Sequence, residues 1–137
     1  AHEVGDHWVQ TSCQAIHKGS SGWAGRLACL RHVLTLTATK LVLASAVLLT
    51  FHVKLNVWQA VAALLVDAGS HYWADRRVTL ERLARRRWVN KGEFYDQGTD
   101  LVNAEGKTSP HVGTGRYALD QSWHILWLFI AALIATA

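Results

Sequence analysis

In three parts of this 137-residue chain a histidine and an aspartate stand four positions apart, as His2 and Asp6, His71 and Asp75, and Asp120 and His124. Residues at this spacing lie on one face of an α-helix, one turn apart, so each pair presents an imidazole and a carboxylate in the same direction. His32 adds a fourth imidazole. Imidazole nitrogen with carboxylate oxygen is the ligand mixture of zinc, manganese and iron sites. The pattern predicts a metal centre whose ligands are His2, Asp6, His32, His71, Asp75, Asp120 and His124.

Four histidines and three aspartates are more than the four ligands that one tetrahedral zinc ion takes. The surplus indicates two divalent ions, or one ion with carboxylates that orient the histidine rings. We expect zinc, with manganese and iron as alternatives. The expected catalytic residues are Asp75 and Asp120. Three further polar residues near the ligands are expected to hydrogen-bond to them rather than to bind metal, namely Asp67, Gln10 and Gln121.

The same residues have a second interpretation, in which His–Asp pairs hydrogen-bond across a helical bundle or relay protons. A lone pair would favour that interpretation. Three pairs with matching spacing, together with His32, favour a metal instead.

Three apolar stretches are long enough to carry these residues into a membrane, since a spanning helix needs about 20 mostly apolar residues. They are Val33 to Val53, Leu55 to Trp73 and Tyr117 to Ala137. The first segment, Ala1 to Lys18, is too polar to span alone, and we interpret it as a fourth helix whose outer half is missing. The sequence therefore predicts an all-α fold, a polytopic membrane bundle of about four helices in a single transmembrane domain over residues 1–137. The predicted ligands fall at one end of these helices, so we expect them in one layer of the inner leaflet.

The basic residues predict the orientation of this bundle. Twelve of the fourteen lysines and arginines lie between the first and second predicted helices or between the third and fourth. The opposite connection, around His52 to Asn56, holds only Lys54. We therefore expect a multi-pass protein of an inner (plasma) membrane, with the basic loops in the cytoplasm and both chain ends outside.

The long cytoplasmic connection, about residues 77–116, divides into two parts. Val78 to Trp88 mixes apolar residues with arginines and is typical of a short interfacial amphipathic helix held by anionic lipid. A solvated basic helix that only enforces topology fits this stretch equally well. The anionic part of a lipid or substrate is expected to be held by Arg85, Arg86 and Arg87. Asn90 to Arg116 is a polar loop, either one that covers a substrate or a mobile one.

The composition and the missing motifs argue against an ordinary soluble protein, a disulfide scaffold and several classes of enzyme. Half of the residues are hydrophobic and the mean hydropathy is +0.08 despite a pI near 9.4, and seven tryptophans fit a membrane–water interface. The two cysteines have neither CxxC spacing nor the density of a disulfide scaffold. The chain has no GxSxG elbow, no glycine-rich phosphate loop and no HExxH motif. The basic cluster beside Trp88 is assigned to the membrane, and no nucleic acid partner is expected.

Four blocks of sequence carry a resemblance to a known family: HEVGDHWVQ, RHVLTLT, SHYWADRR and YALDQSWH. In this order they resemble the signature blocks of a family of small polytopic membrane proteins from bacteria and their phages, known only as a domain of unknown function. The resemblance spans nearly the whole chain and singles out His2, Asp6, Gln10, His32, His71, Asp75, Asp120, Gln121 and His124. A more distant similarity is to membrane-bound metal-dependent hydrolases, whose histidines and aspartates also lie at helix ends. This chain lacks the His-Arg-Gly and Thr-His-Ser runs of those hydrolases.

Together these features predict a metal-dependent hydrolase that acts at the cytoplasmic leaflet on a lipid-linked or phosphate-bearing substrate. The metal would lower the pKa of a bound water and polarise the scissile group. The alternative from another class is a non-enzymatic membrane module, whose basic cytoplasmic face docks a partner protein or anionic lipid while the His/Asp layer is structural. A third function, transport of a divalent ion or proton, needs a polar path that the apolar outer halves of the helices do not offer.

Overall fold

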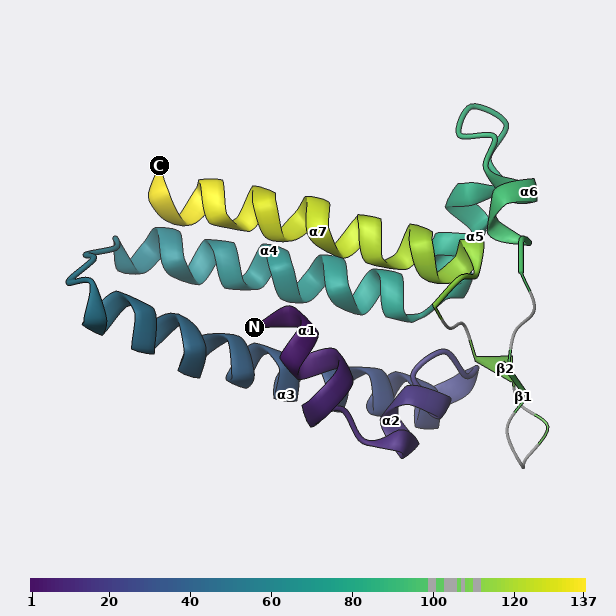
Figure 1. Cartoon of the computed structure of the whole chain (residues 1–137), viewed down its shortest axis with the longest axis horizontal. Coiled ribbons are helices and arrows are strands. Elements are labelled where there is room, and N and C mark those ends of the chain that lie inside the picture. Colours follow the sequence, from purple (N-terminus) through teal and green to yellow (C-terminus); the bar gives the residue numbers. More distant parts are fainter. Residues whose placement is uncertain (99–100, 103–105, 107, 110–111) are drawn as a thin grey trace.

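Three long helices dominate the computed structural model, which describes residues 1–98, 101–102, 106, 108–109 and 112–137. Helix α4 (Val57–Asp75) packs against both α3 (Gly22–Thr50) and α7 (Gly115–Thr136), and the chain direction alternates between neighbours (Figure 1). The described residues form seven α-helices, one π-helical segment and one pair of two-residue strands. The predicted all-α class is therefore confirmed.

Helix α3 starts well before the apolar stretch that was predicted from Val33. It begins at Gly22 and runs for 29 residues, about 43 Å at 1.5 Å per residue. The predicted boundary was wrong because arginines in the first turns lower the local hydropathy without opposing a helix. As a consequence, His32 lies inside the helix rather than at its mouth. Helix α4 starts where the Asn56 side chain accepts from two backbone N–H groups of its first turn.

The N-terminal segment is broken into short pieces instead of forming one helix over Ala1 to Lys18. Helix α1 (His2–Val4) continues into the π-helical segment η1 (Gly5–Val9), and a separate helix α2 (Ser12–His17) follows. A capping box between Thr11 and Gln14 starts α2 anew and ends the first piece. Elements α1 and η1 lie beside α3 (Figure 1). Gly5 makes this approach close, because a Cβ there would lie 2.1 Å from Leu36 Cδ1.

Short elements follow the end of α4, at the end of the molecule that also holds α2 (Figure 1). Helix α5 (Val78–Ala84) covers the first part of the predicted interfacial helix. The stretch predicted as a loop contains helix α6 (Gly92–Tyr95) and the antiparallel strands β1 (Leu101–Val102) and β2 (Thr108–Ser109). The prediction that this loop covers a substrate falls in part on residues 99–100, 103–105, 107 and 110–111, which lie outside the described residues.

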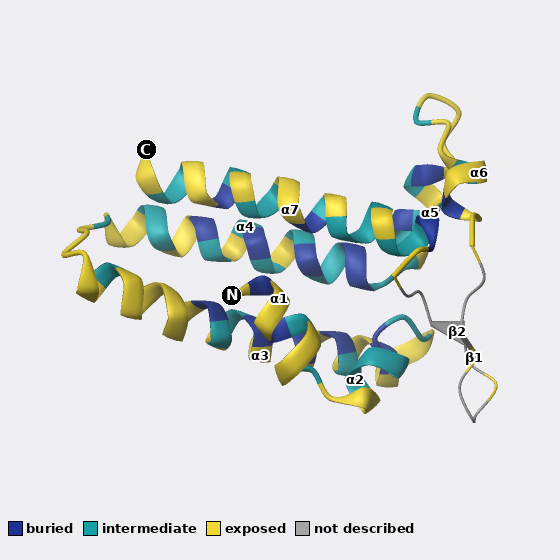
Figure 2. Ribbon diagram, in the orientation of Figure 1, coloured by how far each residue is buried: buried dark blue, intermediate teal, exposed yellow. Residues whose placement is uncertain are grey.

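Burial in this structure is inverted relative to a water-soluble bundle (Figure 2). Helices α3 and α7 are long and apolar enough to cross a membrane, and few of their residues are buried. Large apolar side chains such as Leu49 and Phe129 are exposed. The most deeply buried large side chains are mostly ionisable: Leu36, His32, His71, His124, Asp75 and Cys29. The core of the fold therefore coincides with the predicted site.

Candidate metal centre

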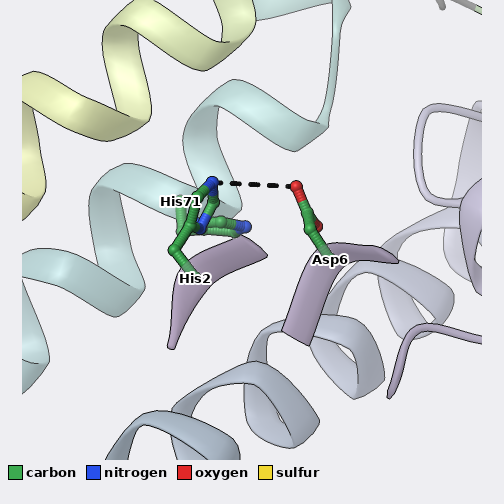
Figure 3. Close-up of side chains that lie close together, drawn as sticks. All are labelled: His2, Asp6 and His71. Carbon is green, nitrogen blue, oxygen red and sulfur yellow. Dashed lines mark ion pairs between the residues drawn. The ribbon is translucent and has the colours of Figure 1, made fainter. Parts of the chain in front are cut away.

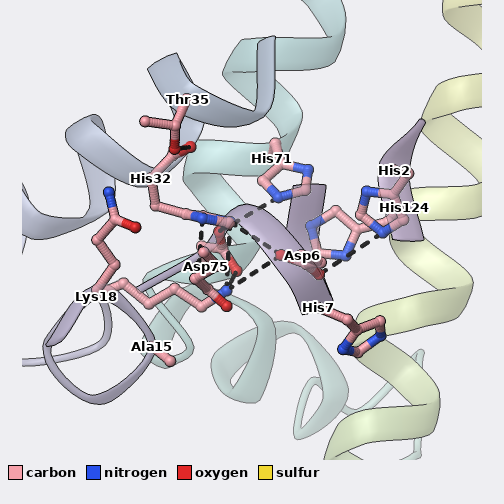
Figure 4. Close-up of polar contacts among 12 residues, drawn as sticks. His2, Asp6, His7, Ala15, Lys18, His32, Thr35, His71, Asp75 and His124 are labelled. Atoms are coloured by element: carbon pink, nitrogen blue, oxygen red, sulfur yellow. Dashed lines mark hydrogen bonds and ion pairs between the residues drawn. The ribbon is translucent and has the colours of Figure 1, made fainter. Parts of the chain in front are cut away.

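Four parts of the chain bring the predicted ligands into one buried cluster (Figure 4). The N-terminal pieces α1 and η1 supply His2 and Asp6, and the interior of α3 supplies His32. The last turns of α4 and the first turns of α7 supply the remaining two pairs. The i, i+4 spacing places each pair on the face of its helix that points to the others. Six of the seven ligand side chains are at most 7 % exposed, and Asp120 is 24 % exposed at the edge.

The cluster contains three triads that could each hold a metal ion, because their ligand atoms lie within 4.8 Å of one another: His2, Asp6 and His71 (Figure 3); His32, His71 and Asp75; and Asp75, Asp120 and His124. Every predicted ligand belongs to at least one triad. A tetrahedral zinc ion with bonds of about 2.1 Å spaces its ligands about 3.4 Å apart, so a small side-chain movement would close each triad on an ion. The first and third triads share no residue, and His71 and Asp75 connect both to the second.

Several imidazole nitrogens in this cluster are buried with no hydrogen-bond partner among the described residues. They are both ring nitrogens of His2 and His124, and Nε2 of His71. The nearest carboxylates lie at 3.4 to 3.8 Å, at the outer limit of an ion pair. A buried polar group left without a partner costs about 1–3 kcal/mol. Each neutral ring therefore has a buried lone pair that a divalent cation could bind and that no other described group uses.

His32 shows how a neighbouring side chain fixes the state of one ring. The amide of Gln10 lies 2.9 Å from His32 Nδ1. With its oxygen turned toward the ring, this amide accepts from Nδ1 and, at 3.0 Å, from Lys18 Nζ. The opposite nitrogen, Nε2, then faces Asp6 Oδ1 at 3.0 Å and Asp75 Oδ2 at 3.1 Å. These are hydrogen-bond distances, so in the absence of an ion Nε2 carries a proton that it donates to these carboxylates, and a metal ion bound to His32 would replace that proton.

Lys18 lies at the centre of the carboxylates, a place that the spacing of the sequence does not indicate. Its Nζ is 2.8 Å from Asp75 Oδ1 and 3.7 Å from Asp6 Oδ1. Burial disfavours the charged form of Lys18, but the carboxylates of Asp75 and Asp6 outweigh burial and raise the pKa of its ammonium group. With all three carboxylates ionised and the imidazoles neutral, as metal binding requires, this one ammonium leaves two negative charges in the cluster.

Asp67 and Gln121 were both predicted to hydrogen-bond to ligands, but only Gln121 contacts a predicted ligand. Asp67 Oδ2 is 2.6 Å from Lys40 Nζ, and both side chains of this ion pair are buried between α3 and α4. Gln121 Nε2 donates to Asp120 Oδ2 at 3.4 Å. The structure thus brings Gln10 and Gln121 into contact with predicted ligands and pairs Asp67 with a lysine.

The three arginines predicted to hold an anion come directly after α5 and belong to none of the triads. Arg85 donates to both oxygens of Asp96, at 2.7 and 2.9 Å, and to Glu81 at 3.0 Å. The Arg85 guanidinium holds the pKa of the Asp96 carboxyl below its ordinary value. Arg86 and Arg87 are exposed.

A pocket of about 170 Å³ opens onto the carboxylate side of the cluster. Its walls include Asp6, Asp75 and Asp120 together with Lys18 and two arginines, Arg77 and Arg116. These three basic residues were predicted only to determine topology, although Arg116 lies four positions before Asp120 on α7. That spacing could have marked Arg116, whereas for Lys18 and Arg77 the only signal is their nearness to the ends of the predicted helices.

No protein-family model matches the chain, and no curated protein or solved structure matches it. The resemblance to the family of small polytopic membrane proteins stays a prediction that rests on the four sequence blocks. The site itself rests on its geometry: buried His/Asp triads, drawn from four parts of the chain, that could hold a metal ion.

Proposed function

We propose that this protein is a multi-pass protein of an inner membrane that binds one or two divalent ions, zinc first among them, and hydrolyses a lipid-linked or phosphate-bearing substrate at the cytoplasmic leaflet. One observation carries the proposal. Seven His and Asp side chains from distant parts of the chain meet in overlapping triads, and five of their buried ring nitrogens have no hydrogen-bond partner among the described residues.

The exposed surface supports a membrane location. Helices α3 and α7 have the length and apolarity of spanning helices, and their apolar side chains point outward. In water such a surface would drive aggregation, whereas lipid solvates it. Helix α4 would complete the bundle, with its ionisable residues turned to the interior. Helix α5, which Arg85, Arg86 and Arg87 follow directly, lies at the end of the bundle opposite the α3–α4 turn (Figure 1), and the positive-inside rule assigns that end to the cytoplasm.

The charge of the cluster supports a divalent ion. With the carboxylates ionised and the imidazoles neutral, one divalent cation would neutralise the two negative charges that remain beside Lys18. The two triads without a common residue, which include His2 and His124, would accommodate a second ion. Zinc suits a mixed imidazole and carboxylate set, and manganese and iron accept the same ligands.

The chemistry follows from the position of the pocket. A metal ion lowers the pKa of a bound water and polarises an oxygen of the scissile group. Asp120 is the most exposed of the seven ligand side chains and lines the pocket, so it is placed to take a proton from that water. Asp75, at the junction of two triads, would hold the ion.

Hydrolysis of bis(p-nitrophenyl) phosphate by the detergent-purified protein, loaded with zinc or manganese, tests this function. Asp75→Asn should abolish hydrolysis while the bundle still assembles, because the amide removes one negative charge from two triads. Glu93→Gln on α6 is a matched control, since Glu93 is exposed and does not line the pocket. Hydrolysis that persists in Asp75→Asn would contradict the ligand assignment.

Lys18 supports a second candidate, the non-enzymatic membrane module. A lysine already pairs with the carboxylates, so the His/Asp layer with Lys18 would be a structural polar network while the basic face docks a partner protein or anionic lipid. Under this function, Arg86→Gln with Arg87→Gln should impair binding to anionic vesicles more than Asp75→Asn does. If the protein is a hydrolase, Asp75→Asn should impair hydrolysis more than Arg86→Gln with Arg87→Gln does.

A further inference from the structure

The pocket above the cluster combines a carboxylate floor with a cationic rim. Asp6, Asp75 and Asp120 line it together with Lys18, Arg77 and Arg116. When the three carboxylates are ionised, their charges balance the three positive charges, so the pocket without an ion does not favour an anion. A divalent ion on the carboxylates would leave the pocket with a positive charge, and a bound anion would then be stabilised by both the ion and the rim.

The fold holds Arg77 at this rim. Arg77 has a φ of 56°, a left-handed backbone conformation that residues other than glycine adopt at an energetic cost, where the chain turns from α4 into α5. Its guanidinium donates to the carbonyl of Ala15 at 2.9 Å. Gly19 makes room for the side chain, because a Cβ there would lie 2.6 Å from Arg77 Cδ. The Arg77 side chain therefore packs against the segment that carries Lys18 and does not extend into solvent.

Arg116 approaches the pocket from the first turn of α7. Its guanidinium lies over the ring of Tyr95 at 5.3 Å and is 3.8 Å from Asp96, whose two oxygens already accept from Arg85. The same turn places the positive end of the α7 dipole at the pocket, which Tyr117 also lines. Arginine pairs with phosphate oxygens through two parallel N–H donors, a geometry that suits a tetrahedral dianion.

We propose that Lys18, Arg77 and Arg116 form a phosphate-binding subsite over the metal centre, so that the substrate presents a phosphate group to this pocket and not to Arg85, Arg86 and Arg87. The inference rests on the proposed metal-binding function. It adds that phosphate binding requires the ion, and that by thermodynamic linkage phosphate tightens the binding of the ion by the same factor.

Phosphorus-31 relaxation of inorganic phosphate, with the full-length protein in detergent loaded with Mn²⁺, tests the subsite. Mn²⁺ is paramagnetic and shortens the relaxation of a phosphate that binds beside it. The parent protein should show this effect, and Arg77→Gln with Arg116→Gln should weaken phosphate binding about tenfold or more through the loss of charge-assisted hydrogen bonds. Arg86→Gln with Arg87→Gln is the matched control and should bind phosphate like the parent.

The binding of Mn²⁺ itself is followed by the electron paramagnetic resonance signal of the free ion. This measurement distinguishes failure of the phosphate subsite from failure of the metal centre. Mn²⁺ binding with phosphate relaxation that is unchanged in the Arg77/Arg116 variant would overturn the subsite and leave the metal centre intact. No Mn²⁺ binding by the parent protein would overturn both. If the double variant loses Mn²⁺ through misfolding, Arg116→Gln alone decides in the same assay, since it keeps the contacts of Arg77 with Ala15 and Gly19.

Competition distinguishes the source of the phosphate group. Displacement of inorganic phosphate by glycerol 3-phosphate supports the subsite and indicates a soluble ester. Displacement by dihexanoyl phosphatidic acid alone supports it and indicates a lipid headgroup. If neither phosphate ester displaces inorganic phosphate, the pocket is not a subsite for a substrate phosphate.

Discussion

Replacing Lys40 by methionine removes one half of an ion pair that is buried between α3 and α4. Lys40 Nζ lies 2.6 Å from Asp67 Oδ2, and the two side chains are only 9 % and 8 % exposed. Removing one partner of a buried pair leaves an uncompensated charge and costs about 3–5 kcal/mol. We expect Lys40→Met and Asp67→Leu each to lower the free energy of unfolding by about that amount.

The double variant separates a structural role of Asp67 from a role at the metal centre. Replacing both charges with apolar side chains of similar volume is often neutral or stabilising. Lys40→Met with Asp67→Leu should therefore unfold within about 1 kcal/mol of the parent protein and should keep its metal content. A non-additive result of this size is the signature of direct contact.

Unfolding in mixed detergent micelles, followed by the fluorescence of the seven tryptophans, measures these differences. Lys54→Met is a matched control, because Lys54 is exposed in the α3–α4 turn and should shift stability by less than about 0.5 kcal/mol. Additive losses in the double variant would refute the ion pair as the reason for the burial of these charges. A folded double variant that has lost its metal would instead show that Asp67 supports the metal centre.

Two further predictions concern the N-terminal segment and the topology. Gly5→Ala should destabilise the protein by about 1–3 kcal/mol and lower its metal content, since the added Cβ meets Leu36 at 2.1 Å. Gly69→Ala inside α4, with no neighbour within 4 Å, should lower neither the stability nor the metal content. Equal losses in the two variants would contradict the close packing of η1 on α3. In intact cells a membrane-impermeant maleimide should not label the exposed Cys13, but should label Val53→Cys in a Cys13→Ser background; the opposite labelling pattern would invert the topology.

The clustering of the predicted ligands could be expected from the sequence because helix geometry connects the spacing of residues to the direction of their side chains. Asp120 and His124 needed only a helix around them to face one way, and the same is true of His71 and Asp75. The ends of apolar stretches then gave the approximate depth at which these pairs meet. Local rules were sufficient for these residues.

The role of Lys18 could not be predicted in this way. Lys18 reaches the cluster because the chain ends α2, turns and enters α3 within a few residues, so that its ammonium folds back onto Asp75. That path depends on tertiary contacts such as the hydrogen bond from Arg76 to the Lys18 carbonyl at 2.7 Å. No periodicity in the sequence encodes such a contact.

The helix boundaries were harder to predict than the helices. Hydropathy marked α3 only from Val33, because its first turns are amphipathic and carry Arg26 and Arg31. The break between η1 and α2 comes from the capping of Thr11 and not from an apolar pattern. The partners of Asp67 and Arg85 depend on which neighbouring helix lies opposite, and spacing along one helix does not specify this.

The metal content of the detergent-purified protein, measured by inductively coupled plasma mass spectrometry, tests the central claim most directly. The comparison is with His71→Ala combined with His124→Ala, two side chains that together belong to all three triads. Near-stoichiometric zinc, manganese or iron in the parent protein, lost in a variant that still folds, is the predicted result. Absence of metal from both proteins, with the variant folded, would contradict the metal centre and leave the His/Asp layer as a hydrogen-bonding network.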